Sequence, residues 1–391
     1  MTESDQKPRH FGKIAILFAV FLLVCALALA EWLLTPKDGR FAADARSSGG
    51  APGRHLQLRE WRPNTTYRMA PPAARLRYGK DEVLQSYDLE IDADGFVAPA
   101  SVHEKPDASI VFLGGSTTES LFVLPENRFP HLAARLLEER LGAKINGLNA
   151  GRSGNNTMHS LLLMLGKVVP QRPDAVVLMH AANDLGVLSK TGGYWEVSDG
   201  RRLVIDETYS VSGAVRSAIK ATIPNTSNAL RRGWRRLRQM LSGSQANAAG
   251  AQDGAAGTPL PDVKGAEDFA SALTSFVEVA RAWGMTPVLM TQFHVRAGSK
   301  KERKSDFLAR EQLAGAVGNR KKFKSSHAAY NEIVRQVAQR TGVQLIDLAA
   351  ARQWAYGDVY DGLHLTDSGS RIAAELVADG LQDTIRQRIA R

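Results

Sequence analysis

Three residues in this sequence have the types and surroundings that nucleophilic catalysis requires. Ser116 follows an apolar run and two glycines, which let the backbone turn sharply and present the hydroxyl. A serine hydroxyl is a weak nucleophile until a base removes its proton. Asp361 and His364, three positions apart near the end of the chain, supply a carboxylate and an imidazole. We therefore expect Ser116 to attack, His364 to act as the base and Asp361 to orient the imidazole.

Acyl transfer also needs hydrogen-bond donors directed at the oxygen that becomes negative. Two other apolar runs end in Asn-Ala-Gly at 149–151 and in His-Ala-Ala-Asn-Asp at 180–184. Gly151 exposes an N–H without a side chain, and Asn183 offers an NH2 group. Each motif has a simpler interpretation when taken alone: a structural or phosphate-binding turn around Ser116, a turn glycine, a helix-capping asparagine and a chance Asp-x-x-His pair. A P-loop is excluded because no lysine precedes the serine.

The elements that must position these residues alternate along the chain. Short apolar runs without polar alternation are typical of buried parallel strands, and helical stretches separate them. The predicted strands are 109–113, 143–148, 175–179, 286–290 and 343–348, and the helical stretches include 130–141, 158–168, 266–283, 328–340 and 370–380. This order predicts a doubly wound sheet covered on both faces, with any site at the carboxyl ends of the strands.

Taken together, the four motifs resemble the SGNH (GDSL-like) hydrolase superfamily over about residues 88–385. The serine, glycine, asparagine and histidine of that family would be Ser116, Gly151, Asn183 and His364. The resemblance implies a three-layer α/β/α flavodoxin-like fold with a five-stranded parallel sheet. It also implies a triad completed by Asp361, and an oxyanion hole formed by the N–H groups of Ser116 and Gly151 and the Asn183 side chain. Two departures are Gly-Gly-Ser-Thr in place of Gly-Asp-Ser, and Ala181 where the family usually has glycine.

Composition limits the other chemistries. The chain has 391 residues, of which 44% are hydrophobic and 23% charged, so wholesale disorder and a many-span membrane protein are both excluded. Its single cysteine, Cys25, allows no internal disulfide and no cysteine-based metal cluster. The nine histidines show no metal-ligand spacing. We expect no metal and no cofactor.

The amino-terminal region predicts export. Residues 14–30 form a run of 17 without a charge, just long enough to span a membrane. Either 14–34 is an uncleaved anchor behind a cytoplasmic tail at 1–13, or a signal peptide is cut after the Ala-Leu-Ala at 28–30. We favour the anchor because the run is longer than an ordinary signal core and Trp32 suits an interface. The rest would lie on the periplasmic or extracellular side of the inner (plasma) membrane, or be secreted after cleavage.

The remaining chain divides into a spacer and pre-domain segment at 35–87 and the hydrolase-like domain at 88–391. A long excursion at about 190–262 interrupts this domain, and its Gly, Ala, Ser and Gln tract at 242–257 is typical of disorder. The net charge of +10 is concentrated in 216–241, with seven basic and no acidic residues, and in 296–324, with ten basic and three acidic residues. These segments would bind anionic lipid or acidic polysaccharide, or are simply solvated faces. Nucleic acid is not expected, because no reader motif is present.

The sequence therefore predicts an exported serine esterase or O-acyltransferase, acting on acetyl esters of envelope or secreted polysaccharide through an acyl-enzyme. A lipid ester or thioester hydrolase is one alternative. A binding or assembly protein of the envelope that keeps the fold without catalysis is the other.

Overall fold

The computed structural model describes residues 54–71, 86–195, 202–206, 259–295 and 320–391, with only the backbone at 320–324. The chain divides into two compact units. The smaller, Met1–Arg54 with Asp206–Ser227, lies almost entirely outside the described residues. The larger, His55–Ile205 with Asn228–Arg391, carries the sheet and its helices, and the fold below is that of this unit.

A five-stranded parallel sheet forms the centre, as predicted, in the spatial order β5-β4-β6-β8-β9. Numbered along the chain, these strands have the order 2-1-3-4-5, which is the flavodoxin-like arrangement. All five lie within two residues of the predicted bounds at each end, because their apolar runs form the buried centre of the fold. The strands are β4 (Ala108–Gly114), β5 (Ile145–Asn149), β6 (Ala175–Met179), β8 (Thr286–Met290) and β9 (Gln344–Ile346).

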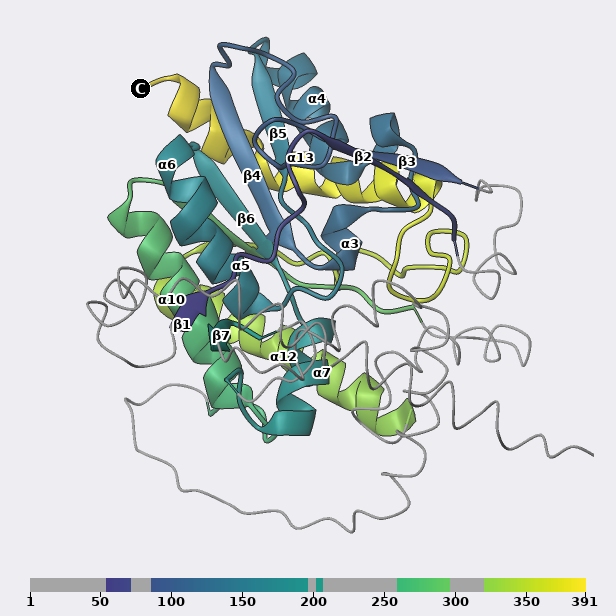
Figure 1. Ribbon diagram of the computed structural model, residues 1–391, viewed down its shortest axis with the longest axis vertical. Helices are drawn as coiled ribbons and strands as arrows, with labels where there is room; N and C mark the ends of the chain where they lie inside the picture. Colours follow the sequence, from purple (N-terminus) through teal and green to yellow (C-terminus); the bar gives the residue numbers. More distant parts are fainter. Residues whose placement is uncertain (1–53, 72–85, 196–201, 207–258, 296–319) are drawn as a thin grey trace, which may run out of the picture. The chain divides into compact units, whose positions relative to one another are not determined.

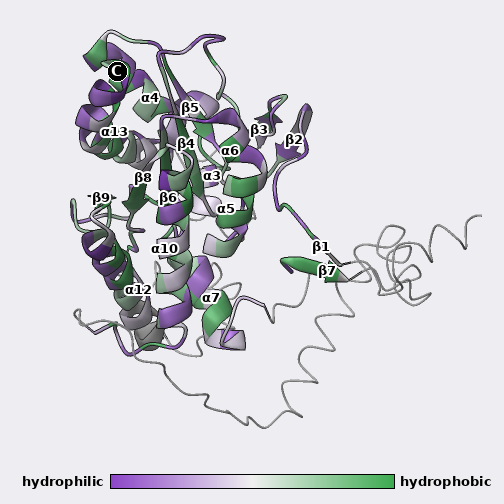
Figure 2. Ribbon diagram, turned by 90° about the vertical axis from the view of Figure 1, so that its left-hand side faces the viewer, coloured by the Kyte–Doolittle hydropathy of each residue, from purple (hydrophilic) through white to green (hydrophobic). Residues whose placement is uncertain are grey.

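Side chains that alternate along the strands belong to two separate hydrophobic clusters, one on each face of the sheet. On one face, Phe112 and Val177 pack with residues of α4 (Phe129–Leu141) and α13 (Asp367–Ile389). On the other, Val111 and Leu178 pack with residues of α5 (Thr157–Leu163), α10 (Ala266–Ala282) and α12 (Arg320–Thr341). Figure 1 shows the two helical layers, and Figure 2 shows the apolar strands between them. The expected three-layer architecture is therefore present.

Short helices occupy the carboxyl edge of the sheet and the connections. These are α3 (Ser116–Glu119), α6 (Val169–Gln171), α7 (Ala182–Thr191), a 3-10 turn (Pro125–Asn127) and a π-helical turn (Met164–Val168) that continues α5. The helix predicted at 370–380 is longer than expected: α13 continues to Ile389 because Gly380, inside it, packs against Ile346 without ending the helix.

Strands also form before the predicted start of the domain. β2 (Thr65–Met69) pairs antiparallel with β3 (Tyr87–Ile91), from Thr65 opposite Ile91 to Met69 opposite Tyr87. β1 (Arg54–Leu56) and β7 (Val204–Asp206) form a separate two-stranded sheet. No helix or strand was expected within 35–87, so β1 and β2 differ from the prediction.

Several predictions fall outside the described residues. They concern the anchor at 14–34, the tract at 242–257, the basic segment at 216–241 and most of the basic segment at 296–324. Within the described ranges, no helix combines the length and apolarity needed to cross a membrane.

The packing of α10 predicts a large stability effect at its buried face. Phe276 is 0% exposed, so Phe276→Ala should lower the free energy of unfolding by about 3–5 kcal/mol through lost apolar contacts and a residual cavity. Trp283, at the end of the same helix, is 51% exposed and serves as the control. Trp283→Ala should change stability by less than about 1 kcal/mol. Urea unfolding followed by circular dichroism measures both, and similar losses would contradict the packing described.

Candidate active site

The structure brings together the serine, histidine and aspartate singled out by the sequence. Ser116 Oγ lies 2.6 Å from His364 Nε2. His364 Nδ1 lies 2.8 Å from Asp361 Oδ1 and 2.7 Å from Asp361 Oδ2. The imidazole therefore has a carboxylate on one nitrogen and a hydroxyl on the other. With Nδ1–H donating to Asp361, Nε2 is free of its proton and can accept the hydrogen of Ser116.

The end of β4 determines where Ser116 stands. Gly114 is the last residue of β4, and a Cβ there would lie 2.0 Å from Thr118 Oγ1, so the turn needs a residue without a side chain. Gly115 has extended backbone angles before α3 begins at Ser116. Ser116 itself is half-buried.

The loop between β9 and α13 holds the imidazole. The side chain of Asp361 accepts hydrogen bonds from the backbone N–H groups of Leu363 at 3.2 Å and of His364 at 3.1 Å, which hold the carboxylate next to Nδ1 of the ring. The ring of Tyr360 stacks on the imidazole, with centroids 5.4 Å apart and planes 10° apart. The side chain of His364 is 12% exposed and that of Asp361 only 2%, so the carboxylate is shielded while the base remains accessible.

Asn183 lies beside the serine turn. It is the second residue of α7, and its Nδ2 donates to the carbonyl of Asn155 at 2.7 Å. A Cβ on Gly115 would lie 2.5 Å from that same Nδ2. An amide NH2 carries two hydrogens, so Asn183 can hold Asn155 with one and offer the other to a substrate oxygen. The Gly-Gly-Ser variant of the motif thus makes room for this amide.

Gly151, predicted as an oxyanion donor, lies in the loop after β5 and packs against α3. Its N–H donates to the side-chain oxygen of Asn149 at 2.9 Å, which occupies the donor assigned to the oxyanion. A Cβ at Gly151 would lie 2.4 Å from the backbone nitrogen of Glu119, so the glycine permits close packing of the loop on α3. Three residues on, Gly154 has a positive φ of 81° and precedes Asn155, whose carbonyl binds Asn183.

Glu119, the last residue of α3, is completely buried and was not expected to belong to the site. It accepts a hydrogen bond from Trp61 Nε1 at 2.9 Å and another from Ser153 Oγ. Burial raises the pKa of the Glu119 carboxyl, and the hydrogen bonds and nearby Arg152 oppose that rise. The guanidinium of Arg152 lies 4.8 Å from the centre of the Trp61 ring. Through Ser153, Glu119 joins α3 to the loop after β5.

A segment upstream of the predicted domain contacts this same loop. Arg59 Nη1 donates to Asn155 Oδ1 at 2.5 Å, and Asn155 Nδ2 donates to the Arg59 carbonyl at 3.0 Å. Residues 59–61 are here called the arm. These two bonds, together with the contact between Trp61 and Arg152, hold the arm against the loop that contains Asn155, the partner of Asn183. A sequence pattern gives no sign of such a contact, because Arg59 and Asn155 are 96 positions apart.

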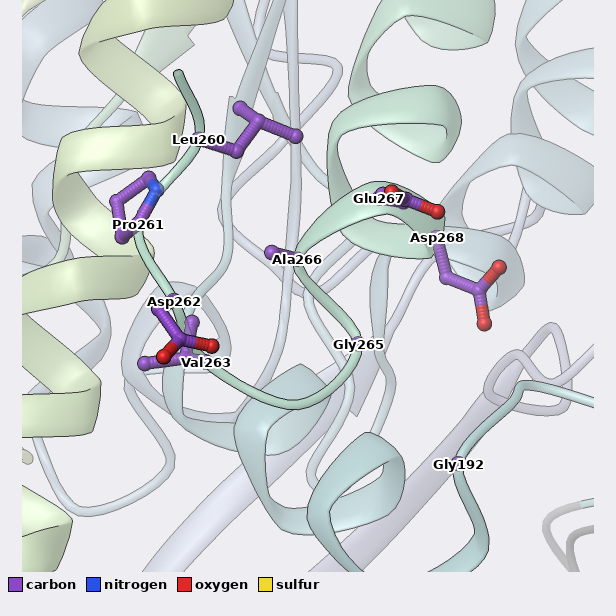
Figure 3. A pocket seen from close by; sticks show the side chains of 9 residues that line it. All are labelled: Gly192, Leu260, Pro261, Asp262, Val263, Gly265, Ala266, Glu267 and Asp268. Carbon is purple, nitrogen blue, oxygen red and sulfur yellow. The ribbon is translucent and has the colours of Figure 1, made fainter. Parts of the chain in front are cut away.

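A separate pocket lies between the end of α7 and the start of α10 (Figure 3). Nine residues line it, among them Asp262, Glu267 and Asp268, and none is a predicted site residue. Among the residues that the structure describes, no group of three or more His, Cys, Asp or Glu side chains is arranged to hold a metal ion.

A comparison with protein families adds to this geometry. The model of the GDSL-like lipase/acylhydrolase family matches residues 112–372, which span the serine turn, the Asn183 motif and the His364 loop. The chain belongs to this family. An ester-hydrolase activity of the SGNH type follows from that membership. A comparison with curated proteins found no match.

Solved structures similar to this chain include other esterases. The lipase/acylhydrolase from Enterococcus faecalis is 14% identical, with 71% of this chain and 96% of that chain covered and a TM-score of 0.40. Axe2, an acetylxylan esterase from Geobacillus stearothermophilus, is 14% identical, with 71% and 94% covered and a TM-score of 0.39. A putative GDSL-like lipase from Parabacteroides merdae is 14% identical, with 72% and 99% covered and a TM-score of 0.39.

The close approach of Asn183 to Gly115 predicts that this glycine is required for activity. In Gly115→Ala the added methyl group would displace the Asn183 amide or the serine turn, and we expect kcat on p-nitrophenyl acetate to fall by about 10- to 100-fold. Gly357→Ala is the control, because a Cβ there would meet nothing within 4 Å. Normal turnover by Gly115→Ala would mean that catalysis does not depend on the position of Asn183.

The arm predicts a second effect on activity. Arg59→Ala removes the side-chain bond to Asn155 and should loosen the loop that binds Asn183, lowering kcat/KM by roughly 10-fold. Arg68→Ala is the control in the same upstream segment: its side chain is 77% exposed and pairs with Asp88 at 4.0 Å. Equal activities of the two variants would count against a functional role for the arm.

Proposed function

We propose that this protein is a serine esterase or O-acyltransferase in which Ser116, His364 and Asp361 form the catalytic triad. The observation that carries the proposal is the continuous chain of contacts from Ser116 Oγ through the imidazole of His364 to the Asp361 carboxylate, at 2.6 Å and 2.7 Å. These distances lie within the reach that proton transfer requires in a resting enzyme.

The geometry supports a two-step reaction. Ser116 Oγ attacks the ester carbonyl carbon while its proton passes to His364 Nε2, and Asp361 stabilises the resulting imidazolium. The tetrahedral intermediate then collapses: the bond to the leaving alcohol breaks, and the alcohol oxygen takes the proton from Nε2. Water attacks the acyl-enzyme in the same way, giving a carboxylic acid and free Ser116. If a sugar hydroxyl attacks instead of water, the acyl group is transferred.

We assign the oxyanion donors to the N–H of Ser116, the Asn183 amide and the N–H of Gly154. The N–H of Ser116 lies at the first residue of α3, where a helix provides no partner of its own. The N–H of Gly151 is taken by Asn149, which argues against the donor predicted from sequence. Gly154 is the substitute, because its positive φ turns the loop immediately before the carbonyl that Asn183 binds.

We propose acetyl esters of an envelope or secreted polysaccharide as the substrate, with the catalytic domain held on the exported side of a membrane by residues 14–34. Support for this location comes from the uncharged run at 14–30 and the preceding basic residues Lys7, Arg9 and Lys13. The basic segments at 216–241 and 296–324 would then meet an acidic polymer or anionic lipid.

A fluorophosphonate probe tests the catalytic proposal. Such probes react with serines activated by a base, so the full chain should be labelled, and Ser116→Ala should lose the label and at least about 10³-fold in esterase turnover. Labelling that persists in Ser116→Ala would place the nucleophile elsewhere. A protein that is neither labelled nor active on any ester would be a binding or assembly module instead.

The acyl preference is tested on the same preparation with p-nitrophenyl esters of increasing chain length. An acetyl-polysaccharide esterase should prefer the acetyl ester, since its acyl pocket has only a methyl group to hold. A strong preference for long chains would instead favour lipid esters. Release of acetate from acetylated polymers, with and without a sugar acceptor, distinguishes hydrolysis from transfer.

A further inference from the structure

A buried glutamine at the carboxyl end of the sheet links three segments of the site. Gln292 follows β8 by two residues and is 7% exposed. Its Oε1 accepts the backbone N–H of Ala182 at 2.9 Å. Its Nε2 donates to Thr117 Oγ1 at 2.8 Å. Thr117 Oγ1 in turn donates to the carbonyl of Leu363 at 3.2 Å.

Each of these partners is the immediate neighbour of a proposed site residue. Thr117 follows Ser116, Ala182 precedes Asn183, and Leu363 precedes His364. The Gln292 side chain, just after β8, thus connects the segments of the nucleophile and of an oxyanion donor directly, and the segment of the general base through Thr117. We infer that Gln292 is a positioning residue for the proposed esterase reaction, holding the segments of Ser116, Asn183 and His364 in one arrangement. This inference rests on the proposed function.

The backbone of Gln292 is itself held on both sides by a residue of α12. Its N–H donates to Asn331 Oδ1 at 3.0 Å, and its carbonyl accepts from Asn331 Nδ2 at 2.7 Å. The backbone of Gln292 is therefore fixed to α12, and its side chain holds the three segments relative to that helix. A backbone N–H such as that of Ala182 can only donate, so the amide oxygen must face it and the NH2 must face Thr117.

Gln292 supplies the hydrogen bond at the start of α7 that no residue of the helix itself provides. Ala182 is the first residue of α7, and the first N–H groups of a helix have no partner within it. The residue before it is Ala181, which has no side chain to cap the helix. The Gln292 oxygen provides that hydrogen bond from the segment after β8, and so holds the start of α7, next to Asn183, in place.

The chemistry of the site requires an amide at position 292. The Thr117 hydroxyl has one hydrogen, which it gives to Leu363 while it accepts from Gln292. An ionised glutamate at 292 cannot donate, so Thr117 would turn to donate to it and release Leu363. A methionine would leave the buried N–H of Ala182 unpaired. Displacements of about 1 Å among catalytic groups cost about 10²-fold in rate.

The experiment compares Gln292→Met with Thr291→Val in the full chain. Thr291 is the neighbouring buried polar residue at the same strand end, but its hydroxyl donates to Asp347 at 2.7 Å and accepts from the Ala349 N–H, away from the triad. We expect Gln292→Met to lower kcat on p-nitrophenyl acetate by about 10²-fold with KM within about threefold, and to slow fluorophosphonate labelling by a similar factor. Thr291→Val should keep kcat even where its melting temperature falls as far.

Two further variants test the mechanism of the effect. Gln292→Glu, which keeps shape and volume, should be as impaired as Gln292→Met at pH 8. Thr117→Val cuts the same link from the other side, so the double variant with Gln292→Met should be little worse than the poorer single variant. Thr117→Val also provides the measurement of kcat if Gln292→Met does not fold.

The outcomes separate the two proposals. If the unmodified protein is labelled and active while Gln292→Met and Thr117→Val keep kcat within about threefold, the inference about Gln292 is overturned and the proposed function stands. A kcat loss shared equally by Thr291→Val would also overturn it, because the effect would then be general destabilisation. If the unmodified protein is neither labelled nor active, both proposals fail.

Discussion

The contact between Ser116 Oγ and His364 Nε2 joins residues 248 positions apart. The contact depends on the architecture of the domain, which brings these two distant segments together. One partner follows the first strand of the parallel sheet and the other lies beyond the last. Parallel strands in a doubly wound sheet all end at the same edge, so residues far apart in sequence meet there without long connecting loops. The strand order with β4 near the centre brings the serine turn beside the end of β6, from which Asn183 approaches.

At the carboxyl edge of the sheet, buried polar contacts link the segments of the site in addition to the hydrophobic packing. Glu119, Asp184 and Gln292 are each buried, and each binds partners from at least one other segment. Asp184 accepts the Thr157 N–H at 2.9 Å and the Tyr194 hydroxyl at 2.6 Å, and burial raises its pKa to about 6. Removing one partner from such a network leaves a desolvated group unpaired, so these contacts specify one arrangement.

The sheet was predictable from sequence because its strands are short apolar runs buried on both faces, a pattern with few alternatives. Ser116, Asp361 and His364, which the structure brings into contact, were also recognisable, since their types and their positions after strands carry the signal. The arm and Gln292 were not, because an arginine in a spacer and a glutamine after a strand have no periodic pattern. Gly151 shows the same limit: its position after β5 can be read from the sequence, but no pattern indicates that its N–H donates to the side chain of Asn149.

The arm also bears on where the catalytic unit begins. The family match starts at residue 112, inside β4, yet the bonds from Arg59 and Trp61 reach the loop after β5 and the helix of Ser116. A fragment cut at the family boundary would lose residues 108–111, the first four of the seven residues of β4, as well as these bonds. A cut at residue 88 would keep the strand and still leave Glu119 without its indole donor and Asn155 without its arginine. The smallest fragment that preserves the site therefore begins no later than about residue 55, where the larger compact unit starts.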